Sequence, residues 1–199
     1  MPSLHPPGPS SGSQASRTRR GYTLVQLMVV VVIAAVAIYF MTTILMNTQN
    51  AFSSGVTTET AQATAVRIAN EVAAELKDAI LPTMYTCSYC KNHISFQKNL
   101  GHDAAGNVIA SNWIYYWYQW NDSYYDPGVG EGKVVRWENG RWGPIGQGVK
   151  ATNPDTGLPG FCITRSGNAV TVSVTVELKD NQNKPVRYTA TTTVTPLTQ

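Results

Sequence analysis

Residues 17–46 read RTRRGYTLVQLMVVVVIAAVAIYFMTTILM, and they set the architecture of the whole chain. Between residues 21 and 58 the only ionisable side chains are those of Tyr22 and Tyr39. As a helix, residues 24–46 would be about 35 Å long, which exceeds the roughly 30 Å hydrocarbon core of a bilayer. The sequence therefore predicts a transmembrane helix over residues 24–46.

The charges on either side of this apolar segment predict its orientation. Arg17, Arg19 and Arg20 precede it, and Glu59 is the first acidic residue of the chain. The positive-inside rule then keeps the N-terminus in the cytoplasm and exports the rest, in bacteria to the periplasm. The chain has 15 Lys and Arg against 12 Asp and Glu, but this excess of three lies in residues 1–21. Bulk charge therefore does not predict a nucleic-acid partner.

Residues 1–16 are mostly Pro, Ser, Gly and other small residues, a composition that does not form a packed core. A secretory signal peptide has a short apolar region followed by a small-residue cleavage site, whereas no Ala-x-Ala site follows this longer run. Cleavage after residues 24–46 is therefore not expected, and the apolar helix should stay on the mature chain.

The junction Arg20-Gly21-Tyr22-Thr23-Leu24 resembles the prepilin peptidase site of the type IV pilin superfamily. The resemblance implies cleavage between Gly21 and Tyr22, followed by N-methylation of Tyr22. It also implies a small filament subunit whose partners are other pilin or pseudopilin subunits, the prepilin peptidase and an inner-membrane assembly platform.

Gln26 departs from the family pattern, which has Glu at the fifth mature position. A neutral amide accepts hydrogen bonds but does not form a charge pair with the N-terminal ammonium of a neighbouring subunit. The departure implies an assembly role for Gln26 in a minor subunit, at the filament tip or in assembly initiation. The alternative is neutral drift in a subunit that tolerates the change.

The second part of the helix shows an amphipathic pattern. Apolar residues recur every three or four positions, namely Ala61, Ala65, Ile68, Val72, Leu76 and Ile80. Pro82 is a stop signal, so the sequence predicts one helix over residues 22–81, with a weak point at Gly55. The fold class is then α+β, with the long helix packed on a mainly antiparallel β head.

Four segments follow from these patterns. They are a prepilin leader (1–21), a transmembrane or filament-core half of the helix (22–46), an amphipathic half (47–81) and an exported β-rich head (82–199). Within the head, alternating valines predict strands at 169–178 and 186–194, joined by a loop at 180–184. Earlier strands are predicted at 114–120, 133–137 and 142–149, with a hairpin turn at 138–141.

The head also resembles the J-type minor pseudopilins at scattered positions. Val135-Arg136, Gly140 and Gly148-Val149 stand in the order that this group shows before its final valine-rich strands.

The three cysteines, Cys87, Cys90 and Cys162, all follow the predicted span. An oxidising compartment favours one disulfide with one thiol left over. A bond from Cys87 or Cys90 to Cys162 is favoured because it closes a long loop, whereas a Cys87–Cys90 bond closes a short one.

Metal binding is the main chemical alternative for these residues. Cys87, Cys90, His93 and His102 supply a ligand set for zinc, which would make the chain a membrane-anchored metal or redox protein. Asp122, Asp126 and Glu131 are candidate calcium ligands in a glycine-rich loop. We expect no resident metal or cofactor, because neither set has the compact spacing of such sites.

The segment 112–125 is rich in aromatic residues. Trp113, Tyr115, Trp117 and Trp120 are candidates to stack on a sugar, a peptide or DNA bases, as in a tip adhesin or a DNA-capturing minor pilin. In the alternative interpretation, Trp113, Tyr115 and Trp117 fill the core, while Tyr116, Tyr118 and Trp120 cover the opposite face or contact a neighbouring subunit.

An enzyme is not predicted. The chain has no glycine-rich nucleotide loop and no local Ser, His and Asp arrangement, and its histidines are His5, His93 and His102. The resemblance to the type IV pilin superfamily implies a minor subunit of a type IV pilus-like or type II secretion-like filament, located in the inner membrane and then in the filament. Pilus, secretion and competence filaments remain open.

Overall fold

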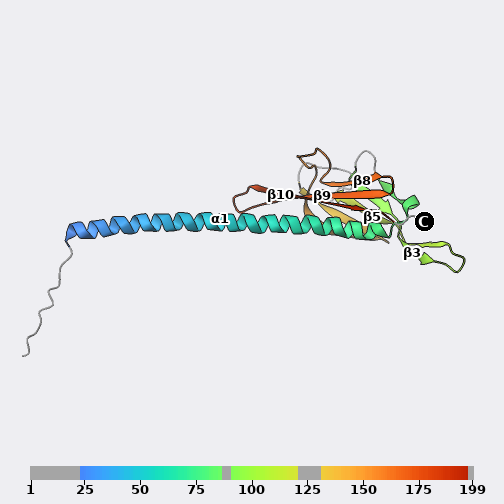
Figure 1. Cartoon of the computed structure of the whole chain (residues 1–199), viewed down its shortest axis with the longest axis horizontal. Coiled ribbons are helices and arrows are strands. Elements are labelled where there is room, and N and C mark those ends of the chain that lie inside the picture. The colour runs from blue at the N-terminus through green and yellow to red at the C-terminus, as the bar shows by residue number, and fades with distance from the viewer. Residues whose placement is uncertain (1–22, 87–90, 121–130, 197–199) are drawn as a thin grey trace, which may run out of the picture. The chain divides into compact units, whose positions relative to one another are not determined.

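The computed structural model describes residues 23–86, 91–120 and 131–196. The chain divides into two units, Met1–Met46 and Asn47–Gln199, and each is described by itself. The second is called the β-rich unit below. One helix, α1 (Leu24–Lys77), has residues in both units (Figure 1). A long N-terminal apolar helix with an antiparallel β-rich domain confirms the predicted α+β class.

Helix α1 begins at a reciprocal cap. The backbone N–H of Thr23 donates to Oε1 of Gln26 at 3.1 Å, and the N–H of Gln26 donates to Oγ1 of Thr23 at 3.4 Å. This is the capping-box pattern, in which a Thr and a Gln three residues later satisfy each other's free backbone donors.

Helix α1 continues through Gly55, where the sequence suggests a weak point. The hydroxyls of Thr57 and Thr58 donate to the carbonyls of Ser53 and Ser54, at 2.9 and 2.8 Å. Such bonds to the preceding turn accommodate hydroxyl side chains without breaking the helix.

The prediction that the helix reaches residue 81 is wrong by four residues. After Lys77, the N–H groups of Asp78 and Ala79 bond three residues back. The N–H of Ile80 instead donates to the carbonyl of Gln97 at 2.8 Å. The backbone thus leaves the helix to pair with an extended segment, before the short 3₁₀ helix η1 (Leu81–Thr83) that contains Pro82.

The main sheet of the β-rich unit has antiparallel pairs throughout, in the order β1-β2-β5-β6-β7-β9-β10, with β8 beside β9. The bounds are β1 Tyr85–Thr86, β2 His93–Phe96, β5 Ile114–Gln119, β6 Glu131–Glu138, β7 Arg141–Lys150, β8 Phe161–Ser166, β9 Ala169–Lys179 and β10 Pro185–Val194. A second sheet is the hairpin of β3 (Asn99–His102) and β4 (Val108–Ala110).

The predicted hairpins are confirmed. Strands β6 and β7 meet at Asn139 and Gly140, whose φ angles of 50° and 76° are those of a two-residue type I′ turn. Strands β9 and β10 flank the predicted loop at 180–184.

The valines of β9 alternate as predicted. Val170, Val172, Val174 and Val176 are all fully buried. The residues between them form a ladder of hydroxyl pairs with β10, such as Thr171–Thr193 at 3.0 Å. One side of the β9–β10 hairpin thus belongs to the core, and the other side is polar.

One hydrophobic core joins the sheet to the part of α1 that lies in the β-rich unit. The helix contributes Ala61, Ala65, Ile68, Ala69, Val72, Ala73 and Leu76, all buried. Five of these are members of the predicted stripe, and the sixth member, Ile80, is half-buried beyond the helix. Gly146 on β7 allows a close approach of the sheet to α1, since a Cβ there would lie 2.2 Å from Cδ1 of Ile68.

Candidate functional site

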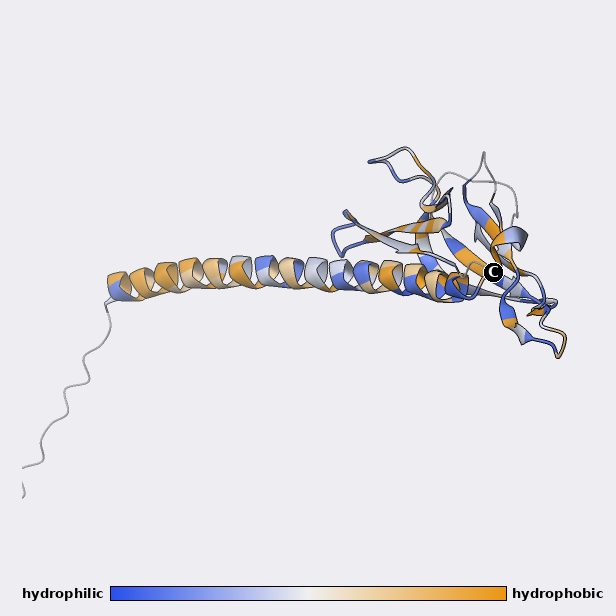
Figure 2. Ribbon diagram, turned by 45° about the vertical axis from the view of Figure 1, so that its right-hand side comes forward, coloured by the Kyte–Doolittle hydropathy of each residue, from blue (hydrophilic) through white to orange (hydrophobic). Residues whose placement is uncertain are grey.

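The first candidate site is the apolar segment of α1, residues 24–46. Every residue in it is exposed, and its most apolar stretch has a mean hydropathy of 2.7 with none of it buried (Figure 2). Within the described residues, α1 is the one helix long and apolar enough to cross a membrane. By length and composition, this segment could span a membrane.

The two threonines inside this segment bond to their own helix. Thr42 donates its hydroxyl to the carbonyl of Ile38, and Thr43 to that of Tyr39, both at 2.9 Å. Hydroxyl groups satisfied within the helix are compatible with an apolar environment, where an unpaired polar group is costly.

The predicted cleavage residues Gly21 and Tyr22 lie outside the described residues. Gln26, the predicted assembly residue, lies in the first turn of α1 and is exposed. Its carbonyl group belongs to the reciprocal cap with Thr23. A Gln or a Glu fills this capping role equally well, so the role is compatible with both the assembly interpretation and neutral drift.

The second candidate site is the sheet face that points away from the core. On β5, Ile114, Tyr116 and Tyr118 are buried, whereas Tyr115 and Trp117 alternate with them and are half-buried. The alternative interpretation that placed Trp113, Tyr115 and Trp117 in the core is therefore wrong. Alternation shows which residues share a face, but it does not show which face is inward when both are aromatic.

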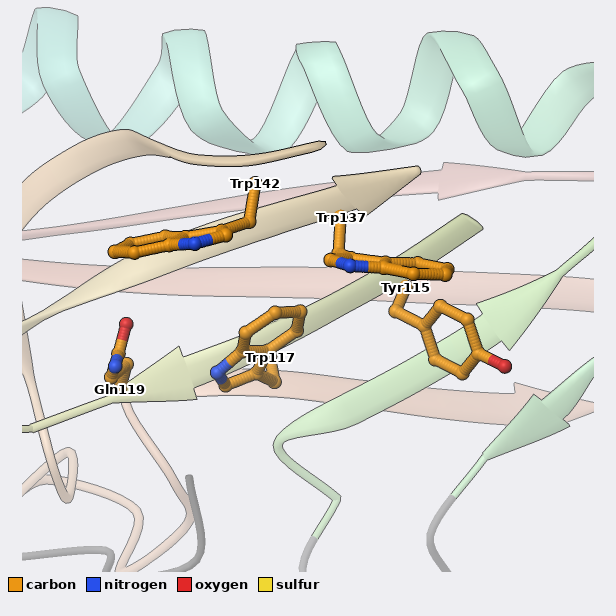
Figure 3. A pocket seen from close by; sticks show the side chains of 5 residues that line it. All are labelled: Tyr115, Trp117, Gln119, Trp137 and Trp142. Carbon is orange, nitrogen blue, oxygen red and sulfur yellow. The ribbon is translucent and has the colours of Figure 1, made fainter. Parts of the chain in front are cut away.

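The outward aromatic residues line a pocket of about 470 Å³. Its described lining residues come from three adjacent strands and are Tyr115, Trp117, Gln119, Trp137 and Trp142. Trp142 and Trp137 lie in one row, and Gln119, Trp117 and Tyr115 form a second row across from it (Figure 3). The rings of Tyr115 and Trp137 meet edge to face with centroids 5.0 Å apart.

The other predicted ligand-binding aromatics lie elsewhere. Trp113 is exposed and approaches Tyr115, with centroids 6.4 Å apart, but it does not line the pocket. Trp120 packs against the core. Of the four candidates, the structure therefore brings together Tyr115 and Trp117.

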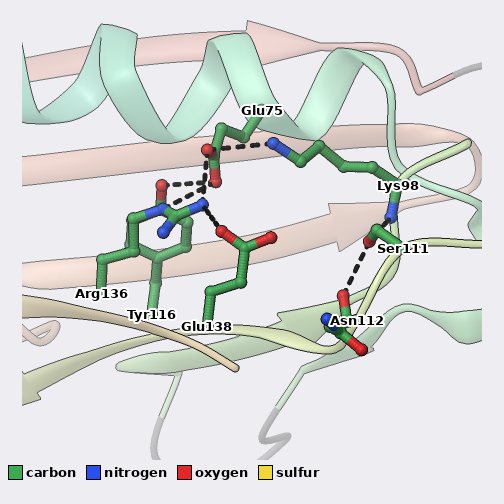
Figure 4. Close-up of polar contacts among 7 residues, drawn as sticks. All are labelled: Glu75, Lys98, Ser111, Asn112, Tyr116, Arg136 and Glu138. Carbon is green, nitrogen blue, oxygen red and sulfur yellow. Dashed lines mark hydrogen bonds and ion pairs between the residues drawn. The ribbon is translucent and has the colours of Figure 1, made fainter. Parts of the chain in front are cut away.

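A cluster of charged residues connects α1 to the sheet (Figure 4). The Glu75 carboxylate accepts hydrogen bonds from Arg136 at 2.9 and 3.1 Å, from the Tyr116 hydroxyl at 2.8 Å and from Lys98 at 3.1 Å. Arg136 also donates to Glu138 at 2.6 Å. These partners come from separate parts of the β-rich unit, so the cluster fixes the helix on the sheet.

The cluster changes the acidity of its members. Burial alone would raise the pKa of Glu75, but hydrogen bonds from Arg136, Tyr116 and Lys98 hold it below its usual 4.5. Burial and the adjacent carboxylate raise the pKa of Tyr116 far above its ordinary value. The carboxylate is therefore ionised and the phenol protonated at neutral pH, as a structural ion pair requires.

The cysteine and metal predictions fall partly outside the described residues, since Cys87, Cys90, Asp122 and Asp126 are not among them. His93 lies on β2, stacked on Tyr115 with centroids 6.3 Å apart, and burial lowers its pKa. The other three candidates are placed by the backbone, with His102 on β3, Glu131 at the start of β6 and Cys162 on β8. No group of three His, Cys, Asp or Glu residues within the described ranges is placed to hold a metal ion.

Cys162 is buried, and burial raises the pKa of its thiol, although Lys91 partly offsets the effect. The N–H of the next residue, Ile163, donates to the carbonyl of Lys91 at 2.7 Å. Lys91 directly follows Cys90 in the sequence. Cys162 is a free cysteine among the described residues, and a disulfide to Cys87 or Cys90, which lie outside them, stays a prediction.

Comparisons of the chain with protein-family models, curated proteins and solved structures found no match. The function is therefore proposed from the residues alone.

Sequence reasoning missed Gln119, Trp137 and Trp142 as pocket residues. A usable signal was present, because the Asn139-Gly140 turn pairs Trp137 directly with Trp142 across the hairpin. It also missed the role of Glu75, because its partners come from distant points in the chain.

Proposed function

We propose that this chain is a minor pilin or pseudopilin, a subunit of a type IV pilus-like or type II secretion-like filament that acts in assembly initiation or at the tip. The observation that carries the proposal is the exposed apolar segment at residues 24–46 of α1. The same helix supplies seven buried residues to the core of the β-rich unit. A helix that needs lipid or neighbouring subunits at one end and a folded domain at the other fits a filament subunit.

The leader motif gives the proposal its order of events. Prepilin peptidase would cut between Gly21 and Tyr22, and Tyr22 would then be N-methylated. The apolar segment would hold the mature chain in the bacterial inner membrane, with the β-rich unit in the periplasm. On assembly, residues 27–40 would exchange lipid for the apolar helices of neighbouring subunits.

Gln26 gives a reason to assign a minor position. An amide at this place does not form the charge pair that a Glu forms with a neighbour's terminal ammonium. Its carbonyl oxygen already accepts from Thr23. A subunit of this kind needs fewer charged axial contacts, as expected at a filament tip or at the start of assembly.

The proposal is non-enzymatic and requires no cofactor. Among the alternatives, the aromatic pocket favours a ligand-binding tip, because it places three tryptophans around one cavity. A membrane-anchored metal or redox protein using Cys87, Cys90 and His93 has less support, since His93 stacks within an aromatic cluster.

The proposal is tested by the mass of the N-terminal peptide after expression with and without a prepilin peptidase. We expect a peptide that begins at Tyr22 and carries one added methyl group only when the peptidase is present. Gly21→Leu should block this processing, because it puts a bulky side chain at the cleaved bond.

The matched control is Gly12→Leu, which makes the same change within the leader and should leave processing intact. A leader that stays attached in the presence of an active peptidase would contradict the filament proposal. The chain would then be a plain membrane-anchored protein.

A further inference from the structure

The aromatic pocket has no part in the proposed membrane or filament contacts of α1. We propose that it binds a pyranose ring of an uncharged glycan. The inference rests on the described residues of β5, β6 and β7 and does not depend on whether the chain enters a filament.

The shape of the pocket suits a flat ligand with an apolar face. Two rows of side chains face each other, with the indoles of Trp142 and Trp137 on one side and Trp117 on the other (Figure 3). A pyranose ring presents C–H groups on one face, and these are attracted to the electron-rich face of an indole. The volume of about 470 Å³ lies within the usual range for small-molecule sites.

Gln119 supplies the polar contact that a sugar requires. Its side chain lines the pocket although the residue is only 8% exposed. Its buried Oε1 has no hydrogen-bond partner within the part of the chain that the structure describes. A buried carbonyl oxygen without a hydrogen-bond partner destabilises the structure. A rotation of the Gln119 side chain toward the pocket would let one sugar hydroxyl donate to this oxygen and a neighbouring hydroxyl accept from the amide N–H₂ group, since an amide offers both functions.

The charges around the pocket favour a neutral ligand. The five described lining residues are uncharged. The ammonium of Lys133 lies 5.9 Å from the centroid of the Trp142 ring. This cation already uses the aromatic surface and would repel a methylated ammonium ligand. Nucleic-acid binding depends on several phosphate contacts, and the five described lining residues supply no cation for them.

The test uses the full chain in a polyoxyethylene detergent, because sugar-headed detergents would compete for the pocket. The chain is applied to an array of neutral oligosaccharides of glucose, galactose, mannose and N-acetylglucosamine. The strongest binder is then titrated with tryptophan fluorescence as the signal. We expect saturable binding that Trp142→Ala weakens by about tenfold or more, as lost aromatic stacking predicts.

Two variants separate stacking from general damage. Trp142→Phe keeps an aromatic face and should restore most of the affinity. Trp113→Ala removes an exposed tryptophan outside the pocket and should leave binding unchanged. Trp142 is 60% exposed, so its replacement should not change the unfolding midpoint.

Three results would overturn the inference. The first is no oligosaccharide binding that depends on Trp142. The second is Trp142-dependent binding of oligothymidylate in place of sugar. The third is self-association of the chain that Trp142→Ala abolishes, which would make the pocket an interface between copies. Each of these leaves the N-terminal mass unchanged and so is separate from failure of the filament proposal.

Discussion

The two ends of α1 are both rich in apolar side chains, but their surroundings differ. In residues 24–46 every side chain is exposed, whereas in residues 61–76 one stripe is buried against the sheet. Ile33 is 63% exposed and Ile68 is fully buried, although they are the same residue type in the same helix. Apolar content alone therefore does not show what a helix packs against, but the spacing of apolar and polar residues does.

The largest expected effect comes from shortening an isoleucine at each end of α1. Ile68→Ala removes buried methylene groups and should lower the free energy of unfolding of the β-rich unit by about 2–5 kcal/mol. Ile33→Ala should leave it unchanged, because Ile33 has no core to lose. Denaturant unfolding of both variants in detergent checks this difference, and equal losses would show that the two ends share one core.

The next effect tests the ionic contact between α1 and the sheet. Glu75→Gln weakens the bonds to Arg136 and Lys98 and should cost about 1.5–3 kcal/mol, since hydrogen bonds to charged groups contribute that much. Glu59→Gln changes an exposed acid on the same helix and should have little effect. Urea unfolding at neutral pH makes the comparison, and equal destabilisation by the two changes would contradict it.

Glu75 also predicts how stability depends on pH. Its pKa, like that of Glu177, is lower in the folded chain than its usual 4.5. A lowered carboxyl pKa stabilises the fold at pH values above 4.5, and this contribution is lost as the pH falls through the folded value. The unfolding midpoint should therefore fall in acid, and Glu75→Gln should flatten this part of the curve. A curve unchanged by Glu75→Gln would contradict the assignment.

The smallest effects concern two glycines in different surroundings. Gly146→Ala places a Cβ against Ile68 and should destabilise the β-rich unit by about 1–3 kcal/mol through overpacking. Gly55→Ala meets no atom within 4 Å and should stabilise α1 by up to about 1 kcal/mol. Thermal unfolding measures the stability of both variants. If Gly146→Ala also stabilised the protein, the close contact between position 146 and Ile68 would not restrict side-chain size there.

The features that the sequence predicts best are those that depend on neighbouring residues. The stripe from Ala61 to Leu76, the Asn139-Gly140 turn and the alternating valines of β9 each follow from local spacing, and the structure confirms them. Strand β8 was not predicted, because its pairing with β9 is not evident from its own sequence pattern.

The candidate sites divide in the same way. The apolar segment at residues 24–46 can be predicted from composition, because no ionisable group other than a tyrosine interrupts it. Only two of the five described pocket residues were predicted, because Trp137 and Trp142 join Tyr115 and Trp117 through sheet pairing. From the sequence alone, Glu75 looks like an ordinary solvent-exposed acid. Its role becomes evident only in the structure, where Arg136 and Lys98 form ion pairs with it.

We infer that residues 24–46 anchor the chain in the membrane while the rest of α1 packs in the β-rich unit. The most direct test compares the full chain with one that begins at Asn47, both exported to the periplasm. After alkaline extraction of membranes, the full chain should remain in the membrane pellet. The shorter chain should be soluble and unfold at the same temperature as the β-rich unit of the full chain. A shorter chain that stays in the pellet, or that does not fold, would contradict the account, because residues 24–46 would then not be the membrane anchor or would be needed for folding.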